Sequence, residues 1–325
     1  MLAIDGGNSK TDLALIDADG TVRAALRGPG ASHEDYGVEG AMHRIGQMIR
    51  LLSEQAAVQD SGGVVARHLS ACLAGADLAE EEAALTVALE TGGWTESAVA
   101  MNDTFAVLRG GADEHWGVAV TCGAGINCVA VAPSGDTARY LAHGTLTGDW
   151  GGGFGLSHAV MWHAMRGWDG RGPATALGDA AAAHFGMGSV RDVAVAMHKG
   201  IIGEDGLIKL TGVLFATAAE GDAVAQSLVD RQAAEVCVMA AAAMRRLRMP
   251  PAGVPVVLGG GVLESREQML LDGVERHLAE LAPGAVARVL DVPPVAGAAL
   301  LGLDHVKASA SAARRLRDHY LYLRA

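Results

Sequence analysis

The sequence predicts an α/β protein made of two related domains with a ligand-binding cleft between them. Its 325 residues exceed what one hydrophobic core usually supports. Short β-type runs alternate with stretches of helical periodicity along most of the chain. In addition, the first strands and their turns recur near residue 119. Length, alternation and repeat therefore agree on a duplicated, two-domain architecture.

Composition and charge limit the classes of partner. Half of the residues are apolar, only 4% are aromatic and 44 are glycine, so we expect a core built largely of alanine, valine and leucine. The net charge of −12 creates a negative potential that repels phosphodiester backbones. We therefore expect no nucleic-acid partner.

The opening residues and the cysteines favour a cytoplasmic protein without a membrane partner. The chain start lacks the basic region and the apolar run of a signal peptide, and no apolar stretch is long enough to span a bilayer. No C-x-x-C pair and no histidine at zinc-binding spacing accompanies the cysteines, which we interpret as small buried residues. They stand at Cys72, Cys122, Cys128 and Cys237.

The first predicted domain spans residues 1–112 and opens with a three-stranded meander joined by glycine-bearing turns. A helix near the C-terminus, about residues 306–325, has an arginine-rich solvated face, and we expect it to pack back on this domain. The expected elements of the domain are strands over Leu2–Asp5, Thr11–Ile16 and Thr21–Leu26, a helix over Asp35–Val58, a strand over Ala66–Ala74, a helix over Asp77–Glu90 and a strand over Ala98–Met101.

The second predicted domain, residues 113–305, begins with a copy of this meander. Residues 3–28 lie over residues 119–144 without a gap, and both copies read strand, glycine turn, strand, turn, strand. The identical pairs are Ala3/Ala119, Gly7/Gly123, Ala14/Ala130, Thr21/Thr137, Arg23/Arg139 and Gly28/Gly144. Helices are expected over Gly155–Arg166, Ala174–Phe185, Val190–His198, Leu210–Ala219 and Ala223–Leu247.

The glycine turn of the first meander, D-G-G-N-S-K-T at Asp5–Thr11, has the composition of a phosphate-binding turn. Its glycines allow a tight turn and close approach, while the polar side chains after them can donate to phosphate oxygens. Asp5 ends the strand where a carboxylate could organise Mg²⁺ and its waters. An ordinary hairpin turn with solvated side chains is the alternative. The segment after Lys10 is a predicted strand, so this is not a Walker loop, which requires a helix there.

Two further glycine turns complete a nucleotide-binding pattern. T-C-G-A-G-I-N at Thr121–Asn127 is the copy of the first turn, and two such turns facing one another would hold a polyphosphate with their backbone N–H groups. The strand Val254–Leu258 runs into Gly259-Gly260-Gly261 and then into a helix over Ser265–Leu281. Strand, glycines and helix in this order suit a nucleotide contact.

Five motifs follow one another along nearly the whole chain: D-G-G-N-S-K-T, N-D-T, T-C-G-A-G-I-N, G-D-W-G-G and L-G-G-G. In order and spacing the chain resembles the BadF/BadG/BcrA/BcrD ATPase family, and within it the N-acetylglucosamine kinases. The resemblance implies two actin-like (ribonuclease H-like) domains and the cofactors ATP and Mg²⁺. It also implies transfer of the γ-phosphate to a hydroxyl, expected to be the 6-hydroxyl, of an amino sugar such as N-acetylglucosamine. We expect a homodimer.

The catalytic base implied by the resemblance is Asp103, directly after a predicted strand. Phosphorylation of a sugar hydroxyl needs a carboxylate within hydrogen-bond reach to accept the proton; capping of a helix is the alternative role for Asp103. Asn127 and Asp149 stand where the family binds its hexosamine, with helix capping as the alternative for Asp149. The expected substrate contacts are Ser32, His33, Asp103, Ile126, Asn127, Gly144 and Asp149.

Two departures from the family pattern bear on the sugar. Trp150 replaces the glutamate of the family's G-D-E-G segment, and Ser32, beside His33, stands where an asparagine is expected. Trp150 could stack on a sugar face or belong to the core. The expected ATP contacts are Gly6, Gly7, Asn8, Ser9, Lys10, Thr11, Gly123, Ala124, Gly125, Ala216, Gly259, Gly260 and Gly261, with Asp5 near the metal.

Two other functions remain open from the sequence. The resemblance includes activators of 2-hydroxyacyl-CoA dehydratases and benzoyl-CoA reductases, whose iron–sulfur cluster needs thiolate ligands, but we see no convincing bridging pair of cysteines. A non-catalytic regulator that binds nucleotide or sugar should have lost its base, whereas Asp103 is present. A ROK-type sugar kinase is disfavoured because that family's zinc-binding cysteine cluster is missing.

Overall fold

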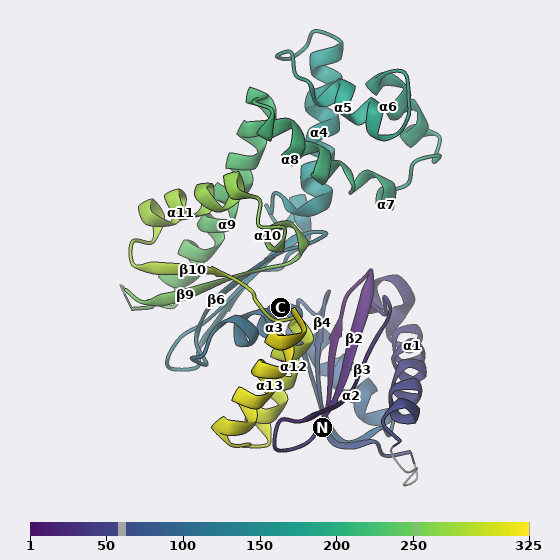
Figure 1. The fold of residues 1–325 in the computed structure, drawn as a ribbon, viewed down its shortest axis with the longest axis vertical. Helices are drawn as coiled ribbons and strands as arrows, with labels where there is room; N and C mark the ends of the chain where they lie inside the picture. Colours follow the sequence, from purple (N-terminus) through teal and green to yellow (C-terminus); the bar gives the residue numbers. More distant parts are fainter. Residues whose placement is uncertain (58–62, 251, 325) are drawn as a thin grey trace. The chain divides into compact units, whose positions relative to one another are not determined.

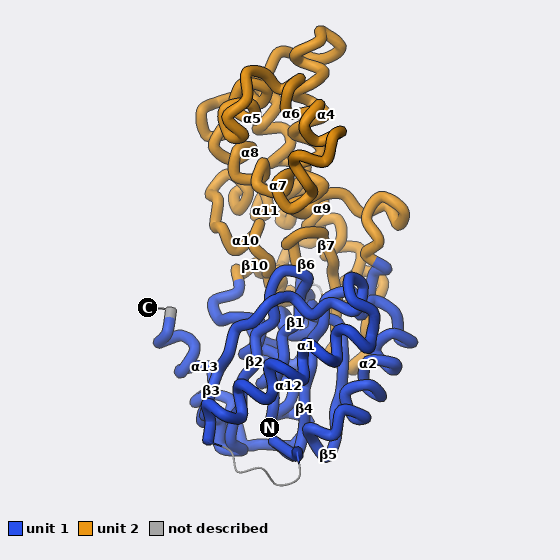
Figure 2. Tube along the Cα trace, turned by 90° about the vertical axis from the view of Figure 1, so that its right-hand side faces the viewer, with its two compact units in different colours: residues 1–119, 139–141, 290–325 blue, residues 120–138, 142–289 orange. Residues whose placement is uncertain are grey.

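The computed structural model describes residues 1–57, 63–250 and 252–324, and the chain forms two compact units (Figure 2). Unit 1 comprises residues 1–119, 139–141 and 290–325, and unit 2 comprises residues 120–138 and 142–289. Residues 290–305, which the sequence analysis groups with the second domain, cluster with unit 1. The structure contains two five-stranded sheets surrounded by helices, as the predicted α/β fold class requires.

The first sheet has the strand order β3-β2-β1-β4-β5. β1 pairs antiparallel with β2 and parallel with β4, and β4 pairs parallel with β5. In this register Gly6 lies opposite both Thr11 and Leu73, and Leu73 lies opposite Asn102. The predicted meander and both following strands are therefore present. The bounds are β1 Leu2–Gly6, β2 Lys10–Ile16, β3 Val22–Pro29, β4 Ala66–Leu73 and β5 Thr95–Asn102.

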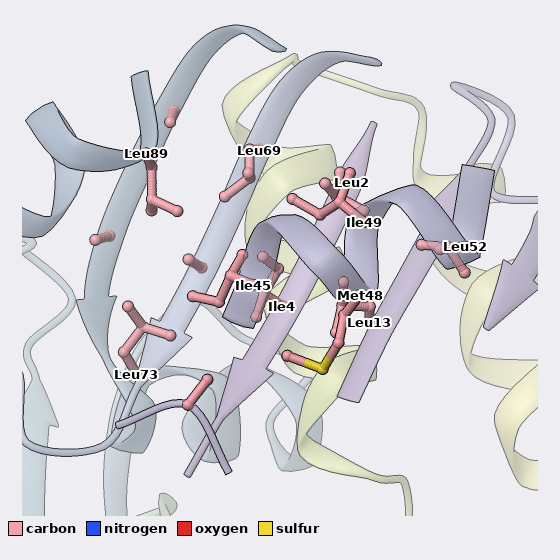
Figure 3. Packing of buried hydrophobic residues seen from close by; sticks show 14 of the residues in the cluster. Leu2, Ile4, Leu13, Ile45, Met48, Ile49, Leu52, Leu69, Leu73 and Leu89 are labelled. Carbon is pink, nitrogen blue, oxygen red and sulfur yellow. The ribbon is translucent and has the colours of Figure 1, made fainter. Parts of the chain in front are cut away.

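One face of this sheet is covered by α1 (His33–Gln55) and α2 (Ala79–Thr91). Ile45, Ile49 and Leu52 of α1 recur at helical spacing and point onto the strands (Figure 3), and each fully buried side chain of this size contributes about 1.5–3 kcal/mol. Ser32 caps α1 by accepting a hydrogen bond from the backbone N–H of Glu34 (3.2 Å). The predicted end of this helix, Val58, lies outside the described residues.

The strands of unit 1 lie between α1 on one side and α12 and α13 on the other (Figure 1). α12 (Pro294–His305) packs on β1, β4 and α3 (Asp103–Gly111). Its approach to α3 is close, because a Cβ atom on Gly297 would overlap the carbonyl group of Ala106. In α13 (Ala310–Arg324), the Arg317 guanidinium donates hydrogen bonds to the last carbonyls of α3 and to Ala112, so the final helix stabilises the end of α3.

The second sheet repeats the topology of the first. Its order is β10-β9-β6-β7-β8. Read from the other edge, β8-β7-β6-β9-β10, it is a three-stranded meander followed by two further strands, as in β3-β2-β1-β4-β5. The shared order agrees with the internal repeat in the sequence. β10, a short strand with alternating burial, was not predicted. The bounds are β6 Gly117–Cys122, β7 Ile126–Val131, β8 Thr137–Arg139, β9 Val254–Gly259 and β10 Ala285–Val289.

Unit 2 also carries most of the helices. The long α9 (Ala223–Arg246) packs against α11 (Gln268–Leu281), α8 and β7, while α4 begins three residues before its predicted start. Within the described part of the chain, no helix combines the length and apolar character needed to cross a membrane. The remaining bounds are η1 Gly144–Leu146, α4 Gly152–Trp168, α5 Leu177–His184, α6 Val190–His198, α7 Glu204–Leu207, α8 Leu210–Ala219 and α10 Gly261–Glu264.

Candidate active site

The first glycine turn is a tight loop between β1 and β2. The Gly7 N–H donates to the Lys10 carbonyl (2.9 Å), and the Ala31 N–H donates to the Gly7 carbonyl (3.3 Å). Gly30 is required here, since a Cβ atom at this position would overlap the Asn8 carbonyl. The side chains at the tip, Asn8, Ser9 and Lys10, are exposed, so the turn presents side-chain donors from a backbone that its neighbours hold in place.

The base of this turn contains a buried carboxylate and a buried hydroxyl. Asp5 is only 9% exposed, and Thr11 is fully buried. The Thr11 Oγ1 atom finds no hydrogen-bond partner among the described residues, a state that costs about 1–3 kcal/mol and is typical of an atom that a ligand satisfies. Mg²⁺ takes one or two protein carboxylates together with phosphate oxygens and waters. The residues present therefore fit a nucleotide-bound Mg²⁺ near Asp5.

Asp103 directly follows β5 and lies at the same edge of the sheet as the first glycine turn. β1, β4 and β5 run parallel, and their ends Gly6, Leu73 and Asn102 are in register. The turn that follows β1 and the residue that follows β5 consequently lie on one edge, two strands apart. The N-cap of α3 is Asn102, whose Oδ1 accepts from the N–H of Thr104 (3.0 Å). The alternative capping role for Asp103 is thus wrong.

A hydrogen-bond network fixes the residue before Asp103. The side-chain amide of Asn102 donates to Asp77 Oδ1, and its backbone N–H donates to Glu82 Oε1, both at 2.8 Å. Glu82 in turn accepts from Arg139 (2.7 Å), which also donates to the Ala76 carbonyl (2.9 Å). Asn102 is therefore held through side chain and backbone together, which orients the first turn of α3.

Burial raises the pKa of Asp103 to about 6, and the nearby Asp77 carboxylate adds to the shift. Burial also raises the pKa of the Cys72 thiol, with Asp5, Asp103 and Glu82 contributing. These carboxylates therefore lie around one buried point at the sheet edge. A carboxylate with a pKa near 6 is mostly ionised at neutral pH and is a stronger proton acceptor than an ordinary aspartate, as a general base requires.

The second glycine turn, between β6 and β7, is braced by the start of α4. The Gly123 N–H donates to the Gly125 carbonyl (3.0 Å), while the carbonyls of Gly123 and Ala124 accept from Gly153 (2.7 Å) and Phe154 (2.9 Å). Gly152, at φ 71°, packs so closely that a Cβ atom would overlap Gly125. This turn carries no polar side chain from Gly123 to Ile126, so it can contact a ligand chiefly through its backbone.

The third glycine turn, between β9 and α10, packs against the second. Gly260 adopts φ 84°, a conformation that favours glycine, and a Cβ atom there would lie 2.5 Å from the Cys122 carbonyl carbon. Its N–H donates to Glu264 Oε1 (3.1 Å). Just before the second turn, the Oγ1 atom of Thr121 is buried and lacks a hydrogen-bond partner in the described part of the chain. Unit 2 thus joins two of the predicted nucleotide turns at one place.

A cavity of about 890 Å³ opens beside the second turn, entirely within unit 2. Three predicted substrate contacts, Ile126, Gly144 and Asp149, line it. Asp149 Oδ2 accepts from Thr147 Oγ1 (2.5 Å). The N-cap of α4 is Gly151, so the alternative capping role for Asp149 is wrong. Trp150 also lines the cavity and lies outside the core.

The other predicted contacts occupy several places. Ser32 and the following His33 form the start of α1 in unit 1, with Ser32 buried as its cap. Asn127 lies in β7 and its Oδ1 accepts from the Cys128 N–H (2.7 Å). Ala216 is exposed on α8. Their contacts to sugar or ATP stay predictions.

The four cysteines are free and buried. Burial raises the pKa of Cys122 and Cys237 to about 12 and that of Cys128 also upward. At neutral pH these side chains are therefore neutral thiols. Among the described residues no group of three or more His, Cys, Asp or Glu side chains could hold a metal ion.

Comparison with known proteins places this site in a family. The model of the BadF/BadG/BcrA/BcrD ATPase family matches residues 2–302. The chain belongs to this family. An N-acetylmuramic acid/N-acetylglucosamine kinase of Clostridium acetobutylicum is 24% identical over 82% of this chain and 86% of its own length. An N-acetyl-D-glucosamine kinase of Dictyostelium discoideum is 23% identical over 94% of this chain and 98% of its own length.

Solved structures share the fold of this family member. A proposed N-acetylglucosamine kinase from Chromobacterium violaceum aligns with a TM-score of 0.73 and 20% identity over 93% of this chain and 98% of its own. A ROK-family glucokinase from Streptomyces griseus, solved with glucose and AMPPNP, aligns with a TM-score of 0.57 and 18% identity over 94% and 98%. The ROK proteins thus share the fold, although the sequence lacks their cysteine cluster.

Sequence reasoning missed two groups of residues. The first group is Asp77 and Glu82, which accept hydrogen bonds from Asn102. Both come after the parallel strand β4, as Asp103 comes after β5. Their position after a parallel strand could have indicated that they lie near Asp103. The cavity wall includes Trp162 of α4 and Arg231 of α9. These two lie far apart in the sequence, so no local motif joins them.

Proposed function

We propose that this family member is an ATP-dependent kinase that transfers the γ-phosphate of ATP to a hydroxyl, the 6-hydroxyl by preference, of an amino sugar such as N-acetylglucosamine. The observation that carries the proposal is the register of β1, β4 and β5, which puts the first glycine turn and Asp103 on one sheet edge. The names of the two relatives, an N-acetylmuramic acid/N-acetylglucosamine kinase and an N-acetyl-D-glucosamine kinase, support the same substrate class.

In the proposed reaction Asp103 accepts the proton of the sugar hydroxyl while the hydroxyl oxygen attacks the γ-phosphorus. The new O–P bond forms, the bond between the γ-phosphorus and the β–γ bridging oxygen breaks, and ADP leaves with that oxygen. Asn8, Ser9 and Lys10 are the proposed side-chain donors to the phosphates, and the backbone N–H groups of the second and third turns are further proposed phosphate contacts. Mg²⁺ near Asp5 would neutralise charge on the triphosphate.

The amino sugar is proposed to bind through Asp149 and the backbone around Ile126 and Gly144, which line the cavity. Asp149 can accept hydrogen bonds from vicinal hydroxyls, with Thr147 holding the other end of its carboxylate. Ser32, His33 and Asn127 are further proposed contacts. We also propose that the enzyme works in the cytoplasm, where ATP is available and its four thiols stay reduced, and that it is a homodimer.

The test is sugar-dependent ADP release by the purified full chain with MgATP and a panel of N-acetylglucosamine, glucosamine, N-acetylmannosamine and glucose. A phosphorylated N-acetylglucosamine identified by mass spectrometry, with the position assigned by NMR, is the expected result. ATP hydrolysis that is independent of every sugar would contradict the proposal. Retained sugar binding in calorimetry without any turnover would instead indicate a non-catalytic binding protein.

A further inference from the structure

The cavity of unit 2 is large for a single hexosamine. Ligand cavities run from about 300 to 1,000 Å³, and this one, at about 890 Å³, lies near the upper end. Asp149 and Gly144, two of the proposed sugar contacts, form only one part of its lining. Much of the remaining lining comes from the residues just before α4, from α4 itself, and from Leu228 and Arg231 of α9.

A row of rings follows one face of α4. Phe154, His158 and Trp162 are spaced four residues apart and all line the cavity, as expected of side chains on one helix face. Trp150 adds a fourth ring from the loop that leads into the helix. We call these four residues the aromatic wall. At 1.5 Å per residue its helical part alone extends over about 12 Å, and a single six-membered sugar ring covers only part of this length.

The two indoles of the aromatic wall are held in place and stay accessible. The guanidinium carbon of Arg231 lies 4.0 Å from the centre of the Trp150 ring, and that of Arg166 lies 4.5 Å from the centre of the Trp162 ring. Trp162 is nevertheless 56% exposed. A large ring that is already fixed offers contact area to a ligand at little cost in side-chain entropy. Both indoles are therefore suited to stacking against a ligand.

The loop that carries Trp150 is also anchored to α9. Gln232 of α9 is fully buried, and its Oε1 accepts a hydrogen bond from the Gly152 N–H (3.0 Å). The approach is close, because a Cβ atom at Gly151 would overlap the Gln232 side chain. This anchor holds Trp150 beside the first turn of α4, in line with the other rings of the aromatic wall.

The lining favours a neutral ligand that carries hydroxyls over an ion or an alkyl chain. In the described part of the chain it includes one arginine, Arg231, and one acid, Asp149, and a second acid, Glu235, lies 3.8 Å from Arg231. Burial, together with two nearby arginines, lowers the pKa of His163, so this ring is mostly neutral at neutral pH. An alkyl chain would cover the polar atoms of His158, His163 and Arg231 without pairing them. A pyranose has C–H groups for the rings and hydroxyls for these atoms.

We propose that the aromatic wall binds a second sugar ring, glycosidically linked to the acceptor amino sugar, so that the preferred substrate is a neutral disaccharide of amino sugars. The ring that contacts Asp149 and Gly144 receives the phosphate, and the second ring stacks along α4 with Trp162 as its main partner. This inference rests on the proposed kinase function and narrows its substrate class. It also gives a role to Trp150, because an indole continues the row of rings where the glutamate of the family pattern would interrupt it.

The test compares kcat/KM for four acceptors: N-acetylglucosamine, N,N′-diacetylchitobiose, octyl N-acetyl-β-glucosaminide and N-acetylmuramic acid. We expect the disaccharide to exceed N-acetylglucosamine by about tenfold, as for one ring stacked on an aromatic side chain, and to exceed the other two acceptors as well. Trp162→Ala should bring the ratio of disaccharide to monosaccharide near one, and Trp162→Phe should retain part of it. Trp168→Ala is the matched control and should keep the wild-type ratio, because Trp168 is 53% exposed on the same helix but does not line the cavity.

The outcomes separate this inference from the kinase function. Turnover of N-acetylglucosamine without preference for the disaccharide would overturn the inference alone, as would a preference for the octyl glycoside or N-acetylmuramic acid over the disaccharide. A ratio that survives in a folded Trp162→Ala variant, checked by circular dichroism, or that falls equally in Trp168→Ala, would also overturn it. If no sugar is phosphorylated, calorimetry decides. Tighter binding of the disaccharide than of N-acetylglucosamine, lost in Trp162→Ala, supports the aromatic wall as a sugar site, and equal binding or no binding of the two refutes it.

Discussion

The first and second glycine turns occupy the same position in two sheets of the same strand order but present different chemistry. The first turn exposes Asn8, Ser9 and Lys10, and a loop containing Gly30 holds it. The second turn presents backbone only and is braced by the N-terminus of α4. Beside the first turn lies an edge rich in carboxylates, and beside the second lies an apolar cavity.

This difference suits the two turns to different tasks. Side-chain donors and carboxylates can bind charge and accept a proton, while a rigid backbone can fix the place of a ligand at little entropic cost. The first turn and the edge beside it therefore offer groups that can bind charge and accept a proton, and the second turn and its cavity offer groups that can shape and select a ligand. Four predictions test this division, in order of expected effect.

Replacing Asp103 by Asn should have the largest effect, a loss of about 10²–10⁴-fold in kcat, because the proposed general base is removed. ATP affinity, measured by calorimetry, should change little. The raised pKa of Asp103 means that ionisation of this residue destabilises the folded state as pH rises through about 6. The melting temperature of Asp103→Asn should hence exceed that of the wild type at pH 8 and match it at pH 4. Unchanged kcat would remove Asp103 from the mechanism.

Substituting the glycines that brace each turn should come next. Gly152→Ala places a Cβ atom on Gly125 at positive φ, and Gly30→Ala places one on Asn8; each should cost about 1–3 kcal/mol of unfolding free energy and weaken ATP binding. Gly212→Ala is the control, since it lies in α8 with open space around it, and helix propensity favours alanine there. Equal stability of all three variants in urea denaturation would show that the braces are unimportant.

Removing the charge beside the base should move the pH profile. Asp77 raises the pKa of Asp103, so Asp77→Asn should lower it and shift the acidic limb of kcat/KM from about pH 6 to lower pH. The plateau should also fall, because a weaker base transfers the proton less readily. The control is Glu220→Gln, at an exposed residue after α8, and it should leave the acidic limb of kcat/KM where it is in the wild type. An unshifted limb in Asp77→Asn would show that Asp77 only supports structure.

The two unpaired hydroxyls should give the smallest effects. Thr11→Val and Thr121→Val remove buried hydroxyls that lack partners, so each should leave the unfolding free energy unchanged or raise it by up to about 1 kcal/mol. Both should weaken MgATP binding several-fold in calorimetry if the nucleotide satisfies these atoms. A larger loss of MgATP affinity in Thr11→Val than in Thr121→Val would agree with a first turn that binds the charged phosphates and a second turn that positions the ligand.

Much of the fold could be predicted because it is encoded locally. Glycine turns between β-type runs predicted the meanders, and the ungapped repeat predicted the shared order of the two sheets. β10 escaped prediction because Ala285–Val289 is a short edge strand whose alternation depends on its partner β9. The place of α12 in unit 1 depends on contacts with β1 and α3, which lie almost 300 and almost 200 residues earlier in the chain, so no local sequence pattern predicts them.

The candidate site also contains residues that a local motif predicts and residues that only tertiary packing brings together. Asp103 follows a strand within a short motif, so its position could be predicted, but the choice of Asn102 as the cap depends on Asp77 and Glu82 from another element. The stacking of Trp150 on Arg231 joins a loop to the middle of α9. Such pairs arise only when packing brings distant segments together, and sequence periodicity contains no record of them.

The contact between Arg317 and the end of α3 has a consequence for biosynthesis. The last carbonyls of α3 accept hydrogen bonds from Arg317, which is synthesised roughly two hundred residues after Asp103. α12, which packs on α3, begins only at Pro294. A nascent chain that already contains both glycine turns therefore still lacks the contacts that hold α3. Chains that end before residue 317 should accordingly have a less stable α3, however complete their upstream part.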